Sequence, residues 1–104
     1  MKTRTMYRIL KTLLKYAGRQ DFSNEMISAK KLGVSYEEWS YIMILLQKSG
    51  YIDGVLYTQD FSQRFPEIVD IDRVGITISG IEYVEENSTM KKVGEFLKEV
   101  GEIL

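Results

Sequence analysis

The sequence predicts a single α+β domain, mostly α-helical, with the layout of a winged helix-turn-helix, a two-stranded wing and added C-terminal helices. Three observations support this prediction. The length of 104 residues suits one domain. The first half contains three helical patterns, with a glycine-containing turn between the second and the third. Two strand-like stretches separated by a polar loop follow, as in a wing.

The first predicted helix covers residues 2–17 and ends at Gly18, which is a suitable C-cap. Its apolar residues recur three and four positions apart and define one buried stripe: Met6, Ile9, Leu10, Leu13, Leu14 and Ala17. Its basic residues follow another face at spacings of four, three and four: Arg4, Arg8, Lys11 and Lys15.

The helix-turn-helix is predicted within Ile27 to Gly50. Residues 28–32 suit a short helix, and Gly33 supplies the turn. The third helix begins at Ser35 and runs to about Ser49. Its start has the Ser-x-x-Glu pattern of a capping box.

The third helix has two distinct faces. One is predicted to enter the core through Trp39, Ile42, Met43 and Leu46. The opposite face would meet the major groove if this were a recognition helix, and it contains Glu37, Ser40, Tyr41, Ile44 and Lys48.

The wing is predicted from two strands. Residues 51–58 are rich in β-branched and aromatic side chains, and an Asp-Gly pair among them permits a bend or bulge. Residues 59–66 contain the only proline and read as a loop. The second strand is either Ile68–Ile71 or Val74–Ile78, and we favour Val74–Ile78.

Two further helices are predicted after the wing. Ser79 caps the first, which ends near Asn87, and Ser88 begins the second. This gives a winged-helix part over residues 1–87 and a C-terminal helix over residues 88–104, within one domain. The last helix has a two-heptad apolar seam that packs on the domain, on a partner or on both, and we favour a homodimer. The seam comprises Met90, Val93, Leu97, Val100 and Leu104.

Composition argues against an enzyme. The chain has neither cysteine nor histidine, which are common catalytic and metal-binding side chains. The glycine patterns of the phosphate-binding P-loop and of dinucleotide-binding folds are both missing from the sequence. We therefore expect no catalytic residues, no cofactor and no metal. No apolar run is long enough to span a membrane, so we expect no membrane partner and a cytoplasmic protein.

Charge is distributed unevenly along the chain, although the net charge is only −1. Residues 1–50 contain nine Lys and Arg against four Asp and Glu, whereas residues 51–104 contain five against eleven. Such asymmetry suggests a nucleic acid or another acidic partner for the first half. The alternative is that the two halves attract each other within the fold.

Three stretches resemble the YjcQ-like family of small winged-helix proteins from bacterial and phage genomes. They are Ile27 to Ser35 continuing to Trp39, then Gly50-Tyr51-Ile52, and the longer and more specific stretch from Ile76 to Lys92. The resemblance implies a winged-helix fold and a phage or prophage setting. It implies no catalytic or ligand-binding residue.

The function expected from these features is that of a winged-helix DNA-binding protein, a phage or prophage type transcriptional regulator that acts on double-stranded DNA. The candidate contacts to phosphates, sugars and bases are Lys30, Lys31, Ser40, Tyr41, Gln47, Lys48 and Arg64.

The alternative is a protein-interaction adaptor on the same scaffold. The candidate interface residues are then Tyr41 and Ile44 on the third helix, together with Met90, Val93, Leu97 and Val100 on the last. The wing region favours this alternative mildly, because residues 59–73 contain four acidic residues and only Arg64 and Arg73. If Tyr41 and Ile44 serve neither role, the C-terminal helix would cover them.

Overall fold

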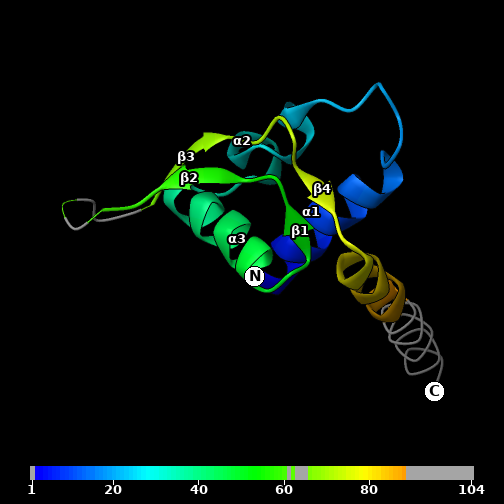
Figure 1. Ribbon diagram of the computed structural model, residues 1–104. Helices are drawn as coiled ribbons and strands as arrows, with labels where there is room; N and C mark the ends of the chain where they lie inside the picture. Colours follow the sequence, from blue (N-terminus) through cyan, green and yellow to red (C-terminus); the bar gives the residue numbers. More distant parts are fainter. Residues whose placement is uncertain (1, 61, 63–65, 89–104) are drawn as a thin grey trace, which may run out of the picture.

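The computed structural model describes residues 2–60, 62 and 66–88. Figure 1 shows three α-helices and a short 3-10 helix, followed by two antiparallel strand pairs and a further helix. The elements are α1 (Lys2–Lys15), η1 (Asn24–Ile27), α2 (Ala29–Leu32), α3 (Tyr36–Lys48), β1 (Ile52–Asp53), β2 (Leu56–Thr58), β3 (Glu67–Asp70), β4 (Gly75–Ile76) and the helix of residues 78–88.

Serine side chains begin the helical segments of the helix-turn-helix. Ser28 Oγ accepts the backbone N–H of Lys31, and Ser35 Oγ accepts that of Glu38, both at 3.1 Å. These bonds satisfy N–H groups that a helix start leaves unpaired. Gly33 separates α2 from α3 in the left-handed region, at φ +73°. The predicted helix-turn-helix is thereby confirmed.

The wing is one long hairpin with a bend. β2 pairs antiparallel with β3, and β1 pairs antiparallel with β4. Gly54, at φ +83°, turns the chain between β1 and β2. Each of the two stretches considered for the second strand therefore contains a strand: β3 pairs with β2, and β4 pairs with β1. The preferred stretch Val74–Ile78 contains the short strand Gly75–Ile76, which pairs with β1, whereas the outer part of the wing uses the other stretch, as Glu67–Asp70.

The helix after the wing begins two residues earlier than predicted. Thr77, not Ser79, is its N-cap, because Thr77 Oγ1 accepts the backbone N–H of Gly80 at 3.1 Å. The same hydroxyl donates to the carbonyl of Gly50 at 2.5 Å, which ties the helix to the end of α3. The helix is described through Ser88, and the residues that follow lie outside the described part, so the predicted end near Asn87 stays a prediction.

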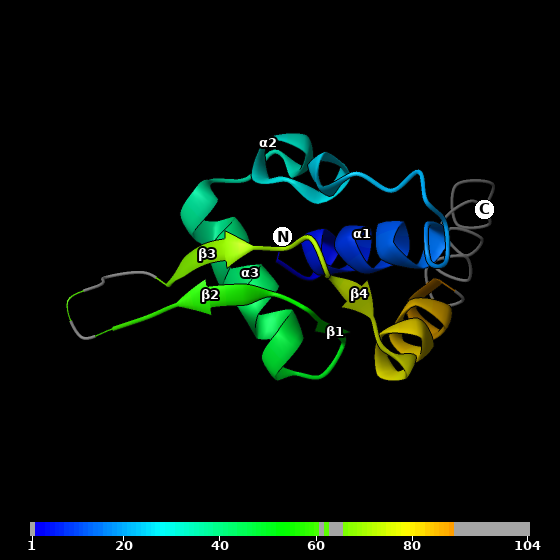
Figure 2. The ribbon, with the colours of Figure 1, turned by 45° about the horizontal axis from the view of Figure 1, so that its top comes forward.

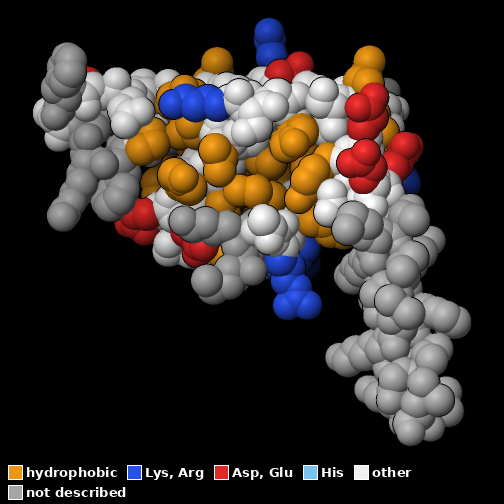
Figure 3. Space-filling view, turned by 90° about the horizontal axis from the view of Figure 1, so that it is seen from below, with side chains coloured by type: hydrophobic (Ala, Val, Ile, Leu, Met, Phe, Trp, Pro, Cys, Tyr) orange, Lys and Arg blue, Asp and Glu red, His pale blue; other side chains and the backbone are white. Residues whose placement is uncertain are grey.

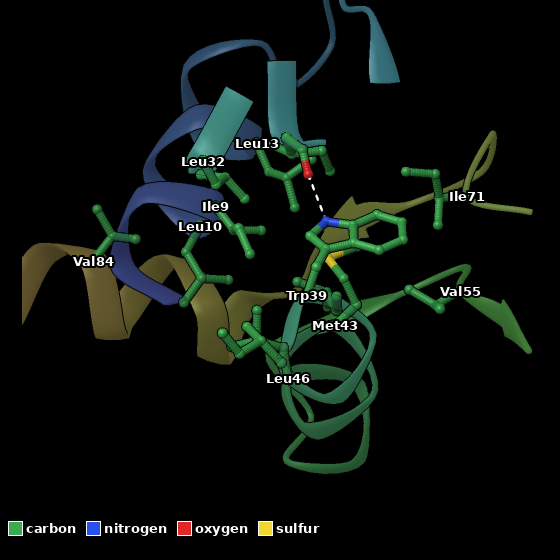
Figure 4. Packing of buried hydrophobic residues seen from close by; sticks show 13 residues of the cluster. Ile9, Leu10, Leu13, Leu32, Trp39, Met43, Leu46, Val55, Ile71 and Val84 are labelled. Atoms are coloured by element: carbon green, nitrogen blue, oxygen red, sulfur yellow. Dashed lines mark hydrogen bonds between the residues drawn. The ribbon is translucent and has the colours of Figure 1, made fainter. Parts of the chain in front are cut away.

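The core lies between α1, α2, α3 and the inner side of the hairpin. Figure 4 shows Leu10 and Leu13 of α1 facing Trp39 and Met43 of α3, with Val55 closing the side nearest the wing. The Trp39 indole N–H donates to the buried carbonyl of Ile27 at 2.8 Å. Val84 anchors the helix of residues 78–88 to this core.

The arrangement leaves two sides of the helical body for contact with other molecules. In Figure 2, α2 lies beside α1, whereas β2 and β3 lie along α3. The hairpin projects from one end of the body in Figure 1, and the helix of residues 78–88 leaves from the other. The fold is thus α+β and mostly helical, as predicted. None of the described helices is both long enough and apolar enough to cross a bilayer.

Candidate nucleic-acid and protein interfaces

Ser40 does not lie on the exposed face of α3. Its side chain is 0% exposed, so the prediction that it faces base edges was wrong. The hairpin packs along this side of the helix, where Tyr36 Oη accepts the backbone N–H of Ile68 at 3.3 Å. The hairpin therefore covers part of the face that helical periodicity alone leaves open.

Gln47 is also unavailable for contact with DNA. Its side-chain amide donates to the carbonyl of Val55 at 2.9 Å, and its oxygen accepts the backbone N–H of Val55 at 2.7 Å. Both ends of the amide are used by one residue of the hairpin. Gln47 thus joins α3 to the wing through two hydrogen bonds, and its assignment as a base contact was wrong.

Ile44 is buried rather than exposed, at 5% exposure, whereas Tyr41 is 51% exposed. The two residues line a hollow of about 210 Å³ between α3 and the base of the hairpin. Ile44 therefore belongs to the wall of the hollow and is no projecting anchor, which corrects the prediction. Its lining among the described residues is Tyr41, Ile44, Leu45, Lys48, Gln59 and Pro66.

The remaining exposed face of α3 is apolar and acidic. Glu37 and Tyr41 are exposed, Leu45 is half-buried, and Lys48 is the only cation of the helix. Figure 3 views the molecule from below, the side on which α3 lies in Figure 1. Hydrophobic side chains fill much of the centre of that view, and Lys and Arg are few and near its edges. Lys and Arg supply most of the electrostatic affinity for DNA phosphates, so this face has little of the charge that DNA binding uses.

The wing adds further negative charge. Between residues 59 and 73 the described carboxylates are Asp60, Glu67, Asp70 and Asp72, and the described cation is Arg73. Asp72 accepts a bond from the side chain of Asn24 at 2.7 Å, which holds the β3–β4 turn against η1.

A separate cationic surface covers the outer sides of α1 and α2. Neither helix contains an acidic residue. The α1 stripe lies opposite the residues that α1 buries, and the Arg8 guanidinium donates to the carbonyl of Leu32, the last residue of α2, at 3.3 Å. This bond brings the α1 stripe next to the lysines of α2. We call this the α1–α2 cationic surface; its six exposed members are Arg4, Arg8, Lys11, Lys15, Lys30 and Lys31.

Among residues 2–60, 62 and 66–88, no ion pair joins the cations of this surface to the acidic second half. Within residues 2–60, 62 and 66–88 the ion pair is Arg19–Asp21, at 2.6 Å. A hydrogen bond from Arg19 lowers the pKa of Asp21, and the same bond raises the pKa of Arg19. Lys11 and Lys15 instead lie over the rings of Tyr7 and Tyr16. Mutual attraction of the two halves therefore does not explain the charge asymmetry of the described part.

Two groups of predicted site residues lie outside the described residues: Arg64 of the wing, and Met90, Val93, Leu97 and Val100 of the C-terminal seam. The part of the chain that is described holds no cluster of acidic side chains able to bind a metal ion.

Sequence reasoning missed Leu45, Gln59 and Pro66 as lining residues of the hollow. The continuous apolar run from Tyr41 to Leu46 was a signal, because such a run places apolar groups on more than one side of a helix. Gln59 and Pro66 gave no comparable signal, since their position depends on the hairpin register.

The order of α1, α2, the glycine turn and α3, followed by an antiparallel hairpin, defines a winged-helix protein. Within that class the chain belongs to the YjcQ family, whose sequence model, described as YjcQ protein, matches residues 7–103. No curated protein and no solved structure shows a significant match.

Proposed function

We propose that this YjcQ-family protein binds double-stranded DNA through the α1–α2 cationic surface and acts as a transcriptional regulator in a phage or prophage setting. The observation that supports DNA binding best is the gathering of six exposed cations on two helices without acidic residues. The regulatory role rests on the winged-helix layout and on the family resemblance.

The spacing of the cations suits a phosphate backbone. Arg4 to Lys15 extends over roughly 16 Å at 1.5 Å per residue, and each strand of DNA has one phosphate per roughly 3.4 Å of axis. The two lysines of α2 extend the surface sideways, beside a hollow formed with η1. Glu25 also lines that hollow and is the carboxylate that opposes phosphate there.

This proposal moves the DNA contact away from the exposed face of α3. Of the residues first considered, Lys30 and Lys31 remain as phosphate contacts. Tyr41 and Lys48 lie on the apolar, acidic side, and Ser40 and Gln47 are used inside the fold. Recognition would then rest mainly on the backbone and shape of the DNA, with little direct reading of bases.

The test is a fluorescence anisotropy titration of a random-sequence DNA duplex with the full chain over a series of salt concentrations. We expect micromolar binding at low salt, with log K falling against log [salt] by about 0.9 per phosphate contacted. Replacing both Lys30→Gln and Lys31→Gln is expected to weaken binding and to reduce that slope by about 1.8.

Lys48→Gln is the matched control, because it removes one exposed cation from the other side of the molecule. We expect it to leave the affinity and the slope nearly unchanged. Equal losses for Lys48→Gln and for the α2 pair would place DNA at α3 and contradict the assignment of the surface. Salt-independent binding would contradict phosphate contacts by these cations, and no binding at low salt would contradict DNA binding itself.

A protein-interaction role is the second candidate function, and the apolar hollow beside α3 favours it. The two roles are compatible, because α1 and α3 bury their apolar faces against the same core and their outer faces point apart.

A further inference from the structure

We propose that the hollow between α3 and the hairpin binds one large apolar side chain of a partner protein, presented on a segment that has Lys or Arg beside it. This inference does not depend on DNA binding. We call the site the α3–wing hollow, and its lining is Tyr41, Ile44, Leu45, Lys48, Gln59 and Pro66.

Size limits what the hollow accepts. Its volume of about 210 Å³ lies below the roughly 300–1,000 Å³ of small-molecule sites. A single buried anchor is the usual centre of a protein contact. One leucine or phenylalanine side chain from a partner is therefore a better occupant than a cofactor or drug-sized ligand.

The lining favours an apolar occupant. Ile44 is almost fully buried, and Leu45 and Pro66 are partly buried. Tyr41 stands at the rim with half of its surface exposed, so an incoming side chain would cover its ring. Burial of this surface would supply the main favourable free energy of contact.

The charges near the hollow select a cationic partner. Glu37 lies one turn before Tyr41 on α3, and Glu67 follows Pro66. Both are exposed, and Lys48 is the one cation among the lining residues that the structure describes. This excess of negative charge attracts Lys or Arg on a partner and repels phosphate.

The hollow is preformed because hydrogen bonds fix the hairpin to α3 at two points. Gln47 bonds Val55 at both ends of its amide, and Tyr36 Oη accepts the N–H of Ile68. A rigid receptor loses little conformational entropy when a partner binds.

The test uses the full ¹⁵N-labelled chain and a short amphipathic helical peptide of leucine and lysine as the probe. NMR titration is expected to shift amide signals of Tyr41, Leu45 and Gln59. Two control peptides of the same length, one of leucine and glutamate and one of serine and lysine, are expected to bind at least tenfold more weakly. They remove the favourable charge and the apolar anchor separately.

Two variants sharpen the test, since both positions are exposed and replacement there should not unfold the chain. Tyr41→Ala is expected to weaken binding of the leucine-lysine peptide about tenfold. Lys48→Glu is expected to strengthen it severalfold. The Lys30→Gln and Lys31→Gln pair, which tests DNA binding, should leave peptide affinity unchanged.

The proposal is overturned if the leucine-lysine peptide fails to bind at millimolar concentration. It is also overturned if the peptide shifts signals mainly around Glu82, Glu85 and Glu86, because that pattern would reflect unspecific attraction to another acidic surface. Equal binding of the leucine-glutamate peptide would disprove the charge preference. Loss of DNA binding in the salt series would leave all these outcomes unaffected.

Discussion

At the scale of single residues, two neighbours on α3 each bury a polar group, and only one of these groups has a hydrogen-bond partner among the described residues. Trp39 is buried with its indole N–H bonded to the Ile27 carbonyl at 2.8 Å. Ser40 is buried with its hydroxyl lacking a hydrogen-bond partner among the described residues. A satisfied buried group stabilises the fold, whereas an unsatisfied one costs free energy.

Ser40→Ala is expected to raise the free energy of unfolding by about 0.5–1.5 kcal/mol, because it removes an unpaired hydroxyl and favours the helix. Urea denaturation measures this change. The variant should bind DNA as well as the native chain does. A loss of stability would show that the hydroxyl has a partner, and a loss of DNA affinity would return Ser40 to the interface.

Trp39→Phe is expected to lower the free energy of unfolding by about 2 kcal/mol, since it leaves the Ile27 carbonyl unpaired and removes part of a buried ring. Far-UV circular dichroism is the suitable probe, because the chain has no other tryptophan to report by fluorescence. Tyr36→Phe is the control: it removes the acceptor of an exposed bond and should cost well below 1 kcal/mol. Similar losses for both variants would contradict the role given to the buried bond.

At the scale of elements, the junction between α3, the hairpin and the helix of residues 78–88 depends on close backbone contact. Thr77 bonds the carbonyl of Gly50 and caps the following helix. Gly80 in the first turn lies against the carbonyl of Tyr51, where a Cβ atom would collide with backbone. The rings of Tyr51 and Tyr83 pack beside this point with centroids 5.2 Å apart.

The Gly80→Ala variant therefore distinguishes the effect of helix propensity on stability from the effect of tertiary packing, because the two have opposite signs. Propensity alone predicts a gain of about 1 kcal/mol, whereas the collision with Tyr51 predicts a net loss of about 1–3 kcal/mol. Thermal unfolding decides between them. Ser79→Ala, an exposed change in the same turn, should be close to neutral. A more stable Gly80→Ala variant would mean that the helix can move away from Tyr51.

At the scale of the whole molecule, charges are separated by side. Cations gather on the outer surfaces of α1 and α2, and carboxylates gather on the wing, at the start of α3 and on the helix of residues 78–88. Opposite charges on different sides allow two partners of opposite charge to bind at once. This separation would make the proposed DNA contact and the proposed protein contact compatible in one small domain.

Stability and DNA affinity are expected not to change with pH near neutrality. The chain has no histidine, so no side chain with an ordinary pKa titrates between about pH 6 and 7. Thermal unfolding and DNA affinity measured across that range should stay constant. A clear step there would reveal a strongly perturbed group.

At acid pH the stability of the fold is expected to depend on pH, because Arg19 lowers the pKa of Asp21 in the folded state. The contribution of Asp21 is fully present above its unfolded pKa of about 3.9, and it is lost as the pH falls through the lower folded value. Since both side chains of the pair are more than half exposed, Asp21→Asn should change stability little at neutral pH and slightly reduce its acid dependence. A strong effect at neutral pH would contradict this assignment.

The amino-acid sequence by itself determined the helices, their caps and the side that each helix buries. Periodicity placed Trp39, Ile42, Met43 and Leu46 in the core, and the serine and glycine positions gave the helix-turn-helix. It also determined the α1 stripe of cations. These features follow from local spacing, which the sequence states directly.

Only the tertiary structure decided which residues of α3 stay exposed and which strand forms the wing. Periodicity treats every side that is not core as open, yet Ser40 and Ile44 are buried in the folded chain, and the hairpin bonds both ends of the Gln47 amide. Strand pairing joins residues distant in the chain, so alternation alone could not choose between Ile68–Ile71 and Val74–Ile78. The candidate interface residues on α3 changed for that reason. The local pattern determines the direction in which a side chain leaves its own helix. Packing between distant segments determines which residues it contacts there.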